Sequence, residues 1–204
     1  MRKLISLIIG FMLLGTLLHP LSAQQFTGGL NLGLTASQVD GDTYKGYNKV
    51  GVSAGGWVNI TFGRHSAFHT GLNYIQKGSR RNPDYEKEDY NSLLIRLGYV
   101  EMPLLYQYRL KSGIFLETGT SIGVLLHSFE EVNGLPSLSN PFRVMDFSFQ
   151  AGIGYQMNEK WKIGIRSGNS LVSIRKERVT GDRRRIWGYG QYNSVLDIEL
   201  AFKL

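Results

Sequence analysis

Apolar and polar residues alternate along much of this chain, which is the pattern of β-strands whose two faces meet different environments. In the first such run, Leu30, Leu32 and Leu34 alternate with Asn31 and Gly33. Comparable runs follow near residues 50–62, 68–77, 100–108, 114–126, 146–156, 161–166 and 196–204. No stretch after residue 25 has the periodicity of a convincing amphipathic helix, so the sequence predicts eight β-strands.

The connections between these runs alternate in length. Long polar connections lie near residues 39–48, 80–92, 128–143 and 176–191, whereas short ones lie near 63–67, 110–113 and 158–160. Short turns at one end and long loops at the other are typical of outer-membrane barrels with an even number of antiparallel strands. The sequence therefore predicts an all-β fold, an eight-stranded antiparallel up-and-down transmembrane β-barrel. Its termini are expected in the periplasm.

In each alternating run, the polar residues form one face of the predicted strand, which we call its polar row, and the apolar residues form the other face, its apolar row. The polar rows help to distinguish a membrane barrel from a soluble, lipocalin-like binding barrel, in which the apolar row points inward. Gly, Ser and Asn dominate these rows, and an eight-stranded barrel leaves an interior just wide enough for side chains. Aromatic residues also gather near the short turns, as in the girdle of a membrane barrel; they are Phe62, Phe68, Tyr106, Tyr108, Tyr155, Trp161 and Phe202. These features favour the membrane barrel, with the soluble barrel as the alternative.

The first 23 residues have the layout of a secretory signal peptide. Arg2 and Lys3 precede an apolar stretch over residues 4–18, and small residues lead to Ala23. We therefore expect cleavage after Ala23 and a barrel domain over residues 24–204. A retained membrane anchor is the less favoured alternative.

Composition excludes several classes of function. The chain has no cysteine, which excludes a disulfide framework, a thiolate zinc site and a cysteine nucleophile. Removing the leader takes away Arg2 and Lys3 and lowers the net charge from +7 to +5. No basic patch interleaved with aromatic residues indicates nucleic acid as a partner. The isolated His65 and His69 do not suggest a metal site, and no cofactor is expected.

Several strand segments resemble the PorT-like outer-membrane β-barrel family of Bacteroidetes. They are residues 28–32 (GGLNL), 71–78 (GLNYIQKG), 99–106 (YVEMPLLY) and 116–119 (LETG). The resemblance implies the barrel fold and a bacterial outer-membrane location. It does not imply one activity, although the founding member of that family is linked to a secretion system for surface proteins. A role in envelope assembly, surface interaction or protein secretion, with envelope proteins as partners, is therefore an expectation.

The charged residues on the polar rows are the residues of the predicted strands best suited to ion pairing or catalysis. Buried charges must be paired, because stranding one costs several kcal/mol. We therefore expect a network that fills the lumen, in which Arg166 lies opposite Asp197 and Glu199; its members are Lys77, Glu101, Glu117, Arg166, Asp197 and Glu199. A narrow ion path or a proton-linked site is the functional alternative. Acid–base chemistry by Glu101 and Glu117 is much less favoured, because so narrow a barrel offers no open cleft.

Two further groups lie at the loop end of the predicted barrel. His127, Ser128 and Glu130 suggest an alternative function as an outer-membrane lipid-modifying hydrolase, provided that the histidine can reach the serine. The last long loop is rich in cations that could contact outer-membrane lipid or lipopolysaccharide phosphates: Arg175, Lys176, Arg178, Arg183, Arg184 and Arg185. A solvated loop and ordinary rim residues are the plainer interpretations, and the sequence favours a non-enzymatic barrel protein.

Overall fold

The computed structural model describes residues 25–41, 46–137, 141–175 and 190–204 of the chain. Its long strands are β1 (Gln25–Asp40), β2 (Lys49–Thr61), β3 (Ser66–Arg81), β4 (Leu93–Arg109), β5 (Ile114–Val132), β7 (Met145–Gln156), β8 (Trp161–Ser170) and β9 (Tyr192–Lys203). The two-residue strand β6 (Leu135–Pro136) pairs with the end of β5, and the 3-10 helix η1 (Tyr85–Lys87) lies between β3 and β4. No helix within the described ranges is long and apolar enough to cross a membrane.

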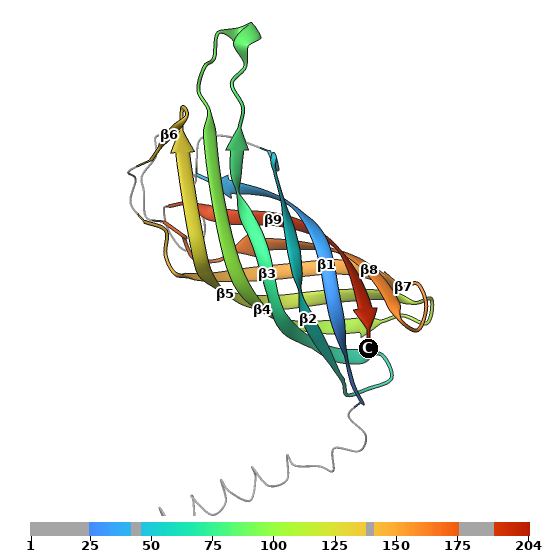
Figure 1. The fold of residues 1–204 in the computed structure, drawn as a ribbon. Helices are drawn as coiled ribbons and strands as arrows, with labels where there is room; N and C mark the ends of the chain where they lie inside the picture. The colour runs from blue at the N-terminus through green and yellow to red at the C-terminus, as the bar shows by residue number, and fades with distance from the viewer. Residues whose placement is uncertain (1–24, 42–45, 138–140, 176–189) are drawn as a thin grey trace, which may run out of the picture.

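The eight long strands form a closed antiparallel ring (Figure 1). Each strand pairs with its neighbours in the chain, β1 pairs with β9, and pairing of β4 with β5 completes the circle. Closure removes exposed sheet edges, as a bilayer requires of a spanning β-structure. The predicted all-β barrel of eight strands is therefore confirmed. The predicted leader, residues 1–23, lies outside the described residues.

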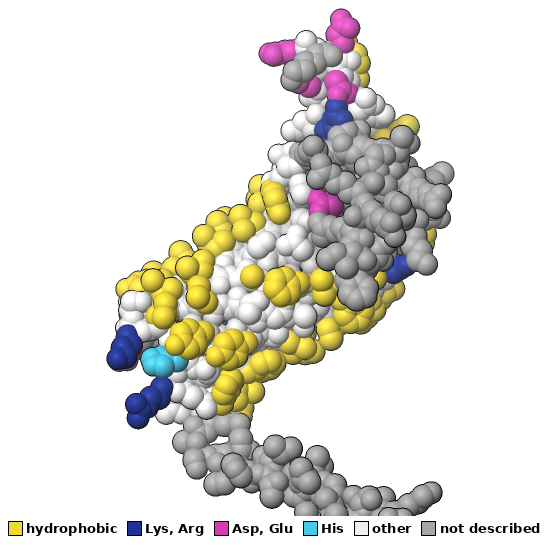
Figure 2. Space-filling view, turned by 180° about the vertical axis from the view of Figure 1, so that it is seen from behind, with side chains coloured by type: hydrophobic (Ala, Val, Ile, Leu, Met, Phe, Trp, Pro, Cys, Tyr) yellow, Lys and Arg dark blue, Asp and Glu magenta, His cyan; other side chains and the backbone are white. Residues whose placement is uncertain are grey.

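The alternating residues divide between the two faces of the wall as the pattern predicts. On β1, Leu32 is 66% exposed, whereas its neighbour Asn31 is 8% exposed and points into the lumen. Hydrophobic side chains cover much of the outer flank of the barrel (Figure 2). A lipocalin-like barrel needs the opposite arrangement, so the soluble alternative does not fit this structure.

The aromatic residues near the short turns form a collar at one end of the barrel. Phe68 faces Tyr106 across β3 and β4, and Trp161 faces Phe202 across β8 and β9, with ring centroids 4.9 Å apart. The short turns and the end of β9 lie together at this end, opposite the long connections (Figure 1).

Strands β4 and β5 extend further towards the long connections than the alternation predicts. Residues 128–132 belong to β5 rather than to a loop, and residues 93–99 of β4 have no counterpart among the predicted runs. A bulge shifts the pairing between Gly98 and Tyr99, and a bulge adds an unpaired residue to one strand. Over residues 93–95 apolar side chains lie on both faces of β4, which hides the alternation there.

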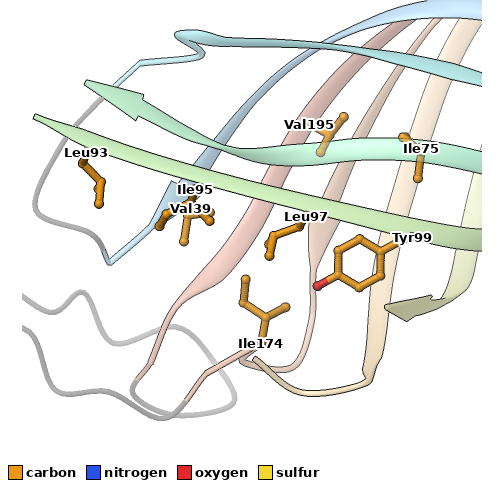
Figure 3. Packing of buried hydrophobic residues seen from close by; sticks show 8 residues of the cluster. All are labelled: Val39, Ile75, Leu93, Ile95, Leu97, Tyr99, Ile174 and Val195. Atoms are coloured by element: carbon orange, nitrogen blue, oxygen red, sulfur yellow. The ribbon is translucent and has the colours of Figure 1, made fainter. Parts of the chain in front are cut away.

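Part of the lumen at the long-connection end is apolar. Eight buried side chains pack together there (Figure 3), and we call them the apolar plug: Val39, Ile75, Leu93, Ile95, Leu97, Tyr99, Ile174 and Val195. They come from β1, β3, β4, β9 and the segment after β8. The expectation that polar rows alone fill the lumen is therefore wrong at this end, because the inward positions of β4 above the bulge are apolar.

We expect the Ile95→Ala substitution to lower the free energy of unfolding by about 2–5 kcal/mol, because Ile95 is fully buried in the plug. Urea-induced unfolding in detergent micelles measures this change. Leu135→Ala is the matched control, since Leu135 is 71% exposed on β6. Equal effects of the two substitutions would contradict a packed plug.

Candidate functional site

Two clusters of buried charge occupy the lumen below the apolar plug. Arg166 on β8 is the centre of the cluster nearer the short turns, and Lys77 on β3 is the centre of the one nearer the plug. We call them the Arg166 cluster and the Lys77 cluster. Both clusters arise because the inward-facing polar row of each strand points toward the barrel axis, where side chains from different strands meet.

In the Arg166 cluster, one guanidinium group binds two carboxylates from different strands. Arg166 Nε donates to Glu117 Oε1 of β5 at 2.7 Å, and Nη2 donates to Glu199 Oε1 of β9 at 2.9 Å. The amides of Gln107 and Asn31 donate to the second oxygens of Glu117 and Glu199, both at 3.3 Å. These charge-assisted bonds satisfy a group that would be costly to bury alone.

Asp197 lies directly opposite Arg166 in the pairing of β8 with β9, but it has a different partner. Its Oδ1 accepts a hydrogen bond from Ser53 on β2 at 2.8 Å. The sequence places Asp197 and Glu199 opposite Arg166, and of these two Glu199 accepts a hydrogen bond from the Arg166 guanidinium group. Glu117, which the sequence places in the network without naming a partner, receives the other.

In the Lys77 cluster, one ammonium group bridges two carboxylates. Lys77 Nζ lies 2.5 Å from Glu101 Oε2 and 3.2 Å from Asp146 Oδ2. Asp146 also accepts hydrogen bonds from Ser170 at 2.7 Å and from Asn193 at 2.9 Å. Asp146 is absent from the predicted network. It lies on the polar row of the run over residues 146–156, so its position in the alternation could have placed it in the lumen.

The space between the two clusters is small. A cavity of about 20 Å³ lies there, with Lys77, Glu101, Arg166 and Asp197 in its wall. That volume is close to the minimum for one water molecule. The described lumen therefore offers no wide water-filled path, and the arrangement suits a structural filling better than an ion path. Glu101 and Glu117 also face no cleft that could admit a substrate.

His127, Ser128 and Glu130 are not assembled as a catalytic triad. The imidazole Nε2 of His127 lies 3.0 Å from the hydroxyl of Tyr74 on β3. The carboxylate of Glu130 is bound by Arg175, at 2.6 Å and 3.0 Å. His127 and Ser128 are consecutive residues of β5 and point to opposite faces of the strand. Neither the serine–histidine contact nor an orienting carboxylate is present.

Arg175 differs from its expected role as an exposed cation. It is 3% exposed, it donates to Gln191 at 2.9 Å as well as to Glu130, and it stacks on the Phe142 ring. The expectation that Arg175 contacts lipid phosphate is therefore wrong, because Arg175 is itself buried and the Glu130 carboxylate already binds its guanidinium group. The other predicted cations, Lys176, Arg178, Arg183, Arg184 and Arg185, lie outside the described residues.

Histidines and acids do not converge on a metal in the described part of the chain. His69 Nδ1 lies 2.6 Å from the amide oxygen of Asn59 inside the barrel, and His65 Nδ1 lies 2.9 Å from the Arg109 carbonyl. No group of three or more His, Cys, Asp or Glu side chains in the described ranges could hold a metal ion.

Comparison with known proteins agrees with this geometry. A family model described as "Outer membrane protein beta-barrel domain" matches residues 22–175, about three quarters of the chain. The chain belongs to this outer-membrane β-barrel family. Its place in the family gives a bacterial outer-membrane location, and none of the curated proteins compared with it matches significantly.

Solved structures show that this outer-membrane barrel has the fold of known small barrels. Neisserial surface protein A is 9% identical, with a TM-score of 0.55 over 89% of this chain and 100% of that one. The attachment invasion locus protein Ail of Yersinia pestis is 12% identical, with a TM-score of 0.50 over 88% of this chain and 99% of that one. At these identities the likeness concerns the fold alone.

Proposed function

We propose that this outer-membrane barrel is a non-enzymatic protein that serves an envelope assembly or a surface interaction through its long-connection end. In this proposal the long connections face the cell exterior and both termini face the periplasm. The observation that carries the proposal is the connection between β3 and β4, which projects beyond the ring (Figure 1). Its tip, seen at the top of Figure 2, is rich in acidic side chains.

The tip of this connection has the composition of a binding surface. Tyr85 and Tyr90 are 69% and 67% exposed, and their rings form an edge-to-face pair with centroids 5.9 Å apart. An ion pair between Arg81 and Asp89 and two backbone hydrogen bonds between Asp84 and Asp89 hold its base. Exposed tyrosines on a preformed support are typical of interface hot spots.

The resemblance of the strand motifs to PorT-like barrels supports an envelope role and suggests protein secretion as the process. Envelope proteins are then the expected partners of the tip. Contact of the last long loop with lipopolysaccharide phosphates remains a separate expectation for Lys176, Arg178, Arg183, Arg184 and Arg185.

Crosslinking in native outer membranes tests the role of the tip. A photo-crosslinking amino acid at position 86 is expected to capture a discrete partner. The combined Tyr85→Ala and Tyr90→Ala variant should reduce that adduct by about tenfold or more, as loss of hot-spot residues does. The same crosslinker at position 47 is the control, because Tyr47 is also exposed but lies on another connection. Identical adducts from positions 86 and 47 would contradict a role specific to the tip.

The filled lumen leads to a prediction about conductance. The purified barrel is expected to give no steady single-channel current in planar bilayers, because both charge clusters and the apolar plug fill its interior. A porin of known conductance, inserted in the same membranes, is the positive control. Steady currents from this protein would overturn the filled-lumen proposal.

The geometry gives little support to the alternative of a lipid-modifying hydrolase, since His127 contacts Tyr74 and Glu130 is bound to Arg175. Mass spectrometry of lipid A from a deletion strain and its parent separates the two functions. A non-enzymatic barrel leaves the lipid A profile unchanged, whereas a changed profile that only the wild-type gene restores, and Ser128→Ala does not, would favour the enzyme.

A further inference from the structure

The barrel wall is open between β2 and β3 at the long-connection end. Pairing between these strands stops at Ser53 and Ile75. Above that point, β2 stays paired with β1 as far as Lys49, and β3 stays paired with β4 as far as Arg81. The two strands therefore diverge, and a pocket of about 410 Å³ lies at this place in the wall. We call it the lateral notch.

Just beyond the last pair of β2 and β3, a side-chain hydrogen bond holds the edge of the notch in place of backbone hydrogen bonds between these strands. The hydroxyl of Thr35 on β1 donates to the carbonyl oxygen of Gln76 at 2.8 Å. This bond crosses directly above Gly51 of β2, where a β-carbon would overlap both partners. The notch is therefore a defined feature of the fold, because Gly51 leaves the space that the Thr35–Gln76 bond needs.

The lateral notch is lined by basic groups and no acidic ones. Lys49, Arg80, Arg96 and His127 lie in its wall together with the apolar side chains of Val50, Leu94 and Leu97, and none of the described residues that line it is Asp or Glu. Arg96 is exposed and has no carboxylate partner within the described ranges. His127 stands over Gly98, where a β-carbon would overlap the imidazole ring.

Lys49 is the unusual member of this group, since it is 5% exposed. Its ammonium group has one long hydrogen bond, to the carbonyl oxygen of Val50 at 3.4 Å, and no ion pair with a described residue. A buried ammonium group normally has an anionic partner. An anion in the notch would supply that partner.

The height of the notch on the barrel indicates which anion. Arg96 is ten positions before Tyr106 of the aromatic collar on β4. At roughly 3.3 Å per residue and a tilt of roughly 40°, Arg96 lies about 25 Å from the collar along the barrel axis. This distance is about the height of the apolar band of such barrels. The cations therefore lie at the level of lipid headgroups in the leaflet opposite the collar, beside the outward-facing Val50, which is 72% exposed.

We propose that the lateral notch binds the phosphate group of an anionic lipid, with Lys49 and Arg96 as its principal ligands. Arg96 supplies a planar guanidinium group suited to two phosphate oxygens. Lys49 approaches from the lumen side of the wall, and the acyl chains lie along the apolar flank near Val50. The assignment to the outer leaflet rests on the proposed orientation of the barrel, whereas lipid binding at the notch does not.

Native mass spectrometry of the full-length mature barrel, released from detergent with dipalmitoyl phosphatidic acid, tests this site. The wild type is expected to retain one phosphatidic acid molecule in preference to dipalmitoyl phosphatidylcholine. The Lys49→Met and Arg96→Met double variant should bind it about tenfold or more weakly, because each loses a hydrogen bond to a charged group. Lys111→Met with Arg64→Met is the matched control, since both residues are exposed cations at the short turns. Heat-modifiable migration in gels verifies that each variant is folded.

Three results would overturn the proposal: equal retention of the two lipids by the wild type, equal loss of phosphatidic acid from the test and control variants, and displacement of the lipid by millimolar inorganic phosphate. The last result would identify a site for free phosphate rather than for a lipid. Should the double variant fail to fold, Arg96→Gln alone provides the same comparison, because Arg96 is exposed and its loss leaves no buried group unpaired.

Discussion

The Arg166→Ala variant is expected to unfold with a free energy about 3–5 kcal/mol lower than that of the wild type, because it leaves two buried carboxylates without their shared cation. Glu117 and Glu199 would then repel each other inside a narrow lumen. Urea-induced unfolding in detergent micelles or liposomes measures this loss. The variant is expected to show no new conductance in planar bilayers, since the apolar plug and the Lys77 cluster still fill the barrel.

Arg64→Ala is the control for this variant, because Arg64 is an exposed arginine in the short connection between β2 and β3. It should change the free energy of unfolding by less than about 0.5 kcal/mol. Arg166→Lys separates charge from geometry, since lysine keeps the positive charge but cannot bridge Glu117 and Glu199 with a planar group. An unchanged unfolding midpoint in Arg166→Ala would remove the proposed role of this ion pair.

The Lys77→Met variant should have an effect of similar size, also about 3–5 kcal/mol, because Glu101 and Asp146 lose their only bridging cation among the described residues. Methionine keeps most of the side-chain volume, so the change reports mainly the lost charge. The same unfolding experiment measures it, and Lys111→Met is the exposed control.

A double-mutant cycle shows whether the Lys77 effect comes from its carboxylates. Adding Glu101→Gln to Lys77→Met removes one of the two stranded negative charges. The double variant should therefore be more stable than the sum of the two single changes predicts, by about 0.5–3 kcal/mol. Simple additivity would indicate that Lys77 and Glu101 do not interact energetically.

The alternation of apolar and polar residues was sufficient to predict the ring and the faces of its strands. Leu32 and Asn31 lie on opposite faces as their positions predict, and the rule holds because each strand separates lipid from a narrow interior. It failed at the start of β4, where Leu93, Leu94 and Ile95 place apolar side chains on both faces of the strand. A period-two pattern carries no information about strand orientation at such a place.

The membership of the charge clusters was partly predictable, but their pairing was not. The positions of Lys77, Glu101 and Arg166 on the polar rows predict, from the sequence alone, that their side chains point into the lumen. The partner of each depends on strand stagger, which sets the height of one strand against another across the lumen. Asp197 lies opposite Arg166 in the pairing of β8 with β9, yet its hydrogen bond comes from Ser53 of β2, and Arg175 is bound by Glu130 of β5 instead of facing lipid.

Several polar bonds across the lumen join strands that are not neighbours in the ring. Arg166 connects β8 to Glu117 of β5, Lys77 connects β3 to Asp146 of β7, and Ser53 connects β2 to Asp197 of β9. A hairpin or half-ring of this chain would therefore present unpaired charges to hydrocarbon, which is strongly unfavourable. The barrel is accordingly expected to insert and to unfold as one cooperative unit, and a chain cut in the connection between β4 and β5 should not yield halves that enter a bilayer separately.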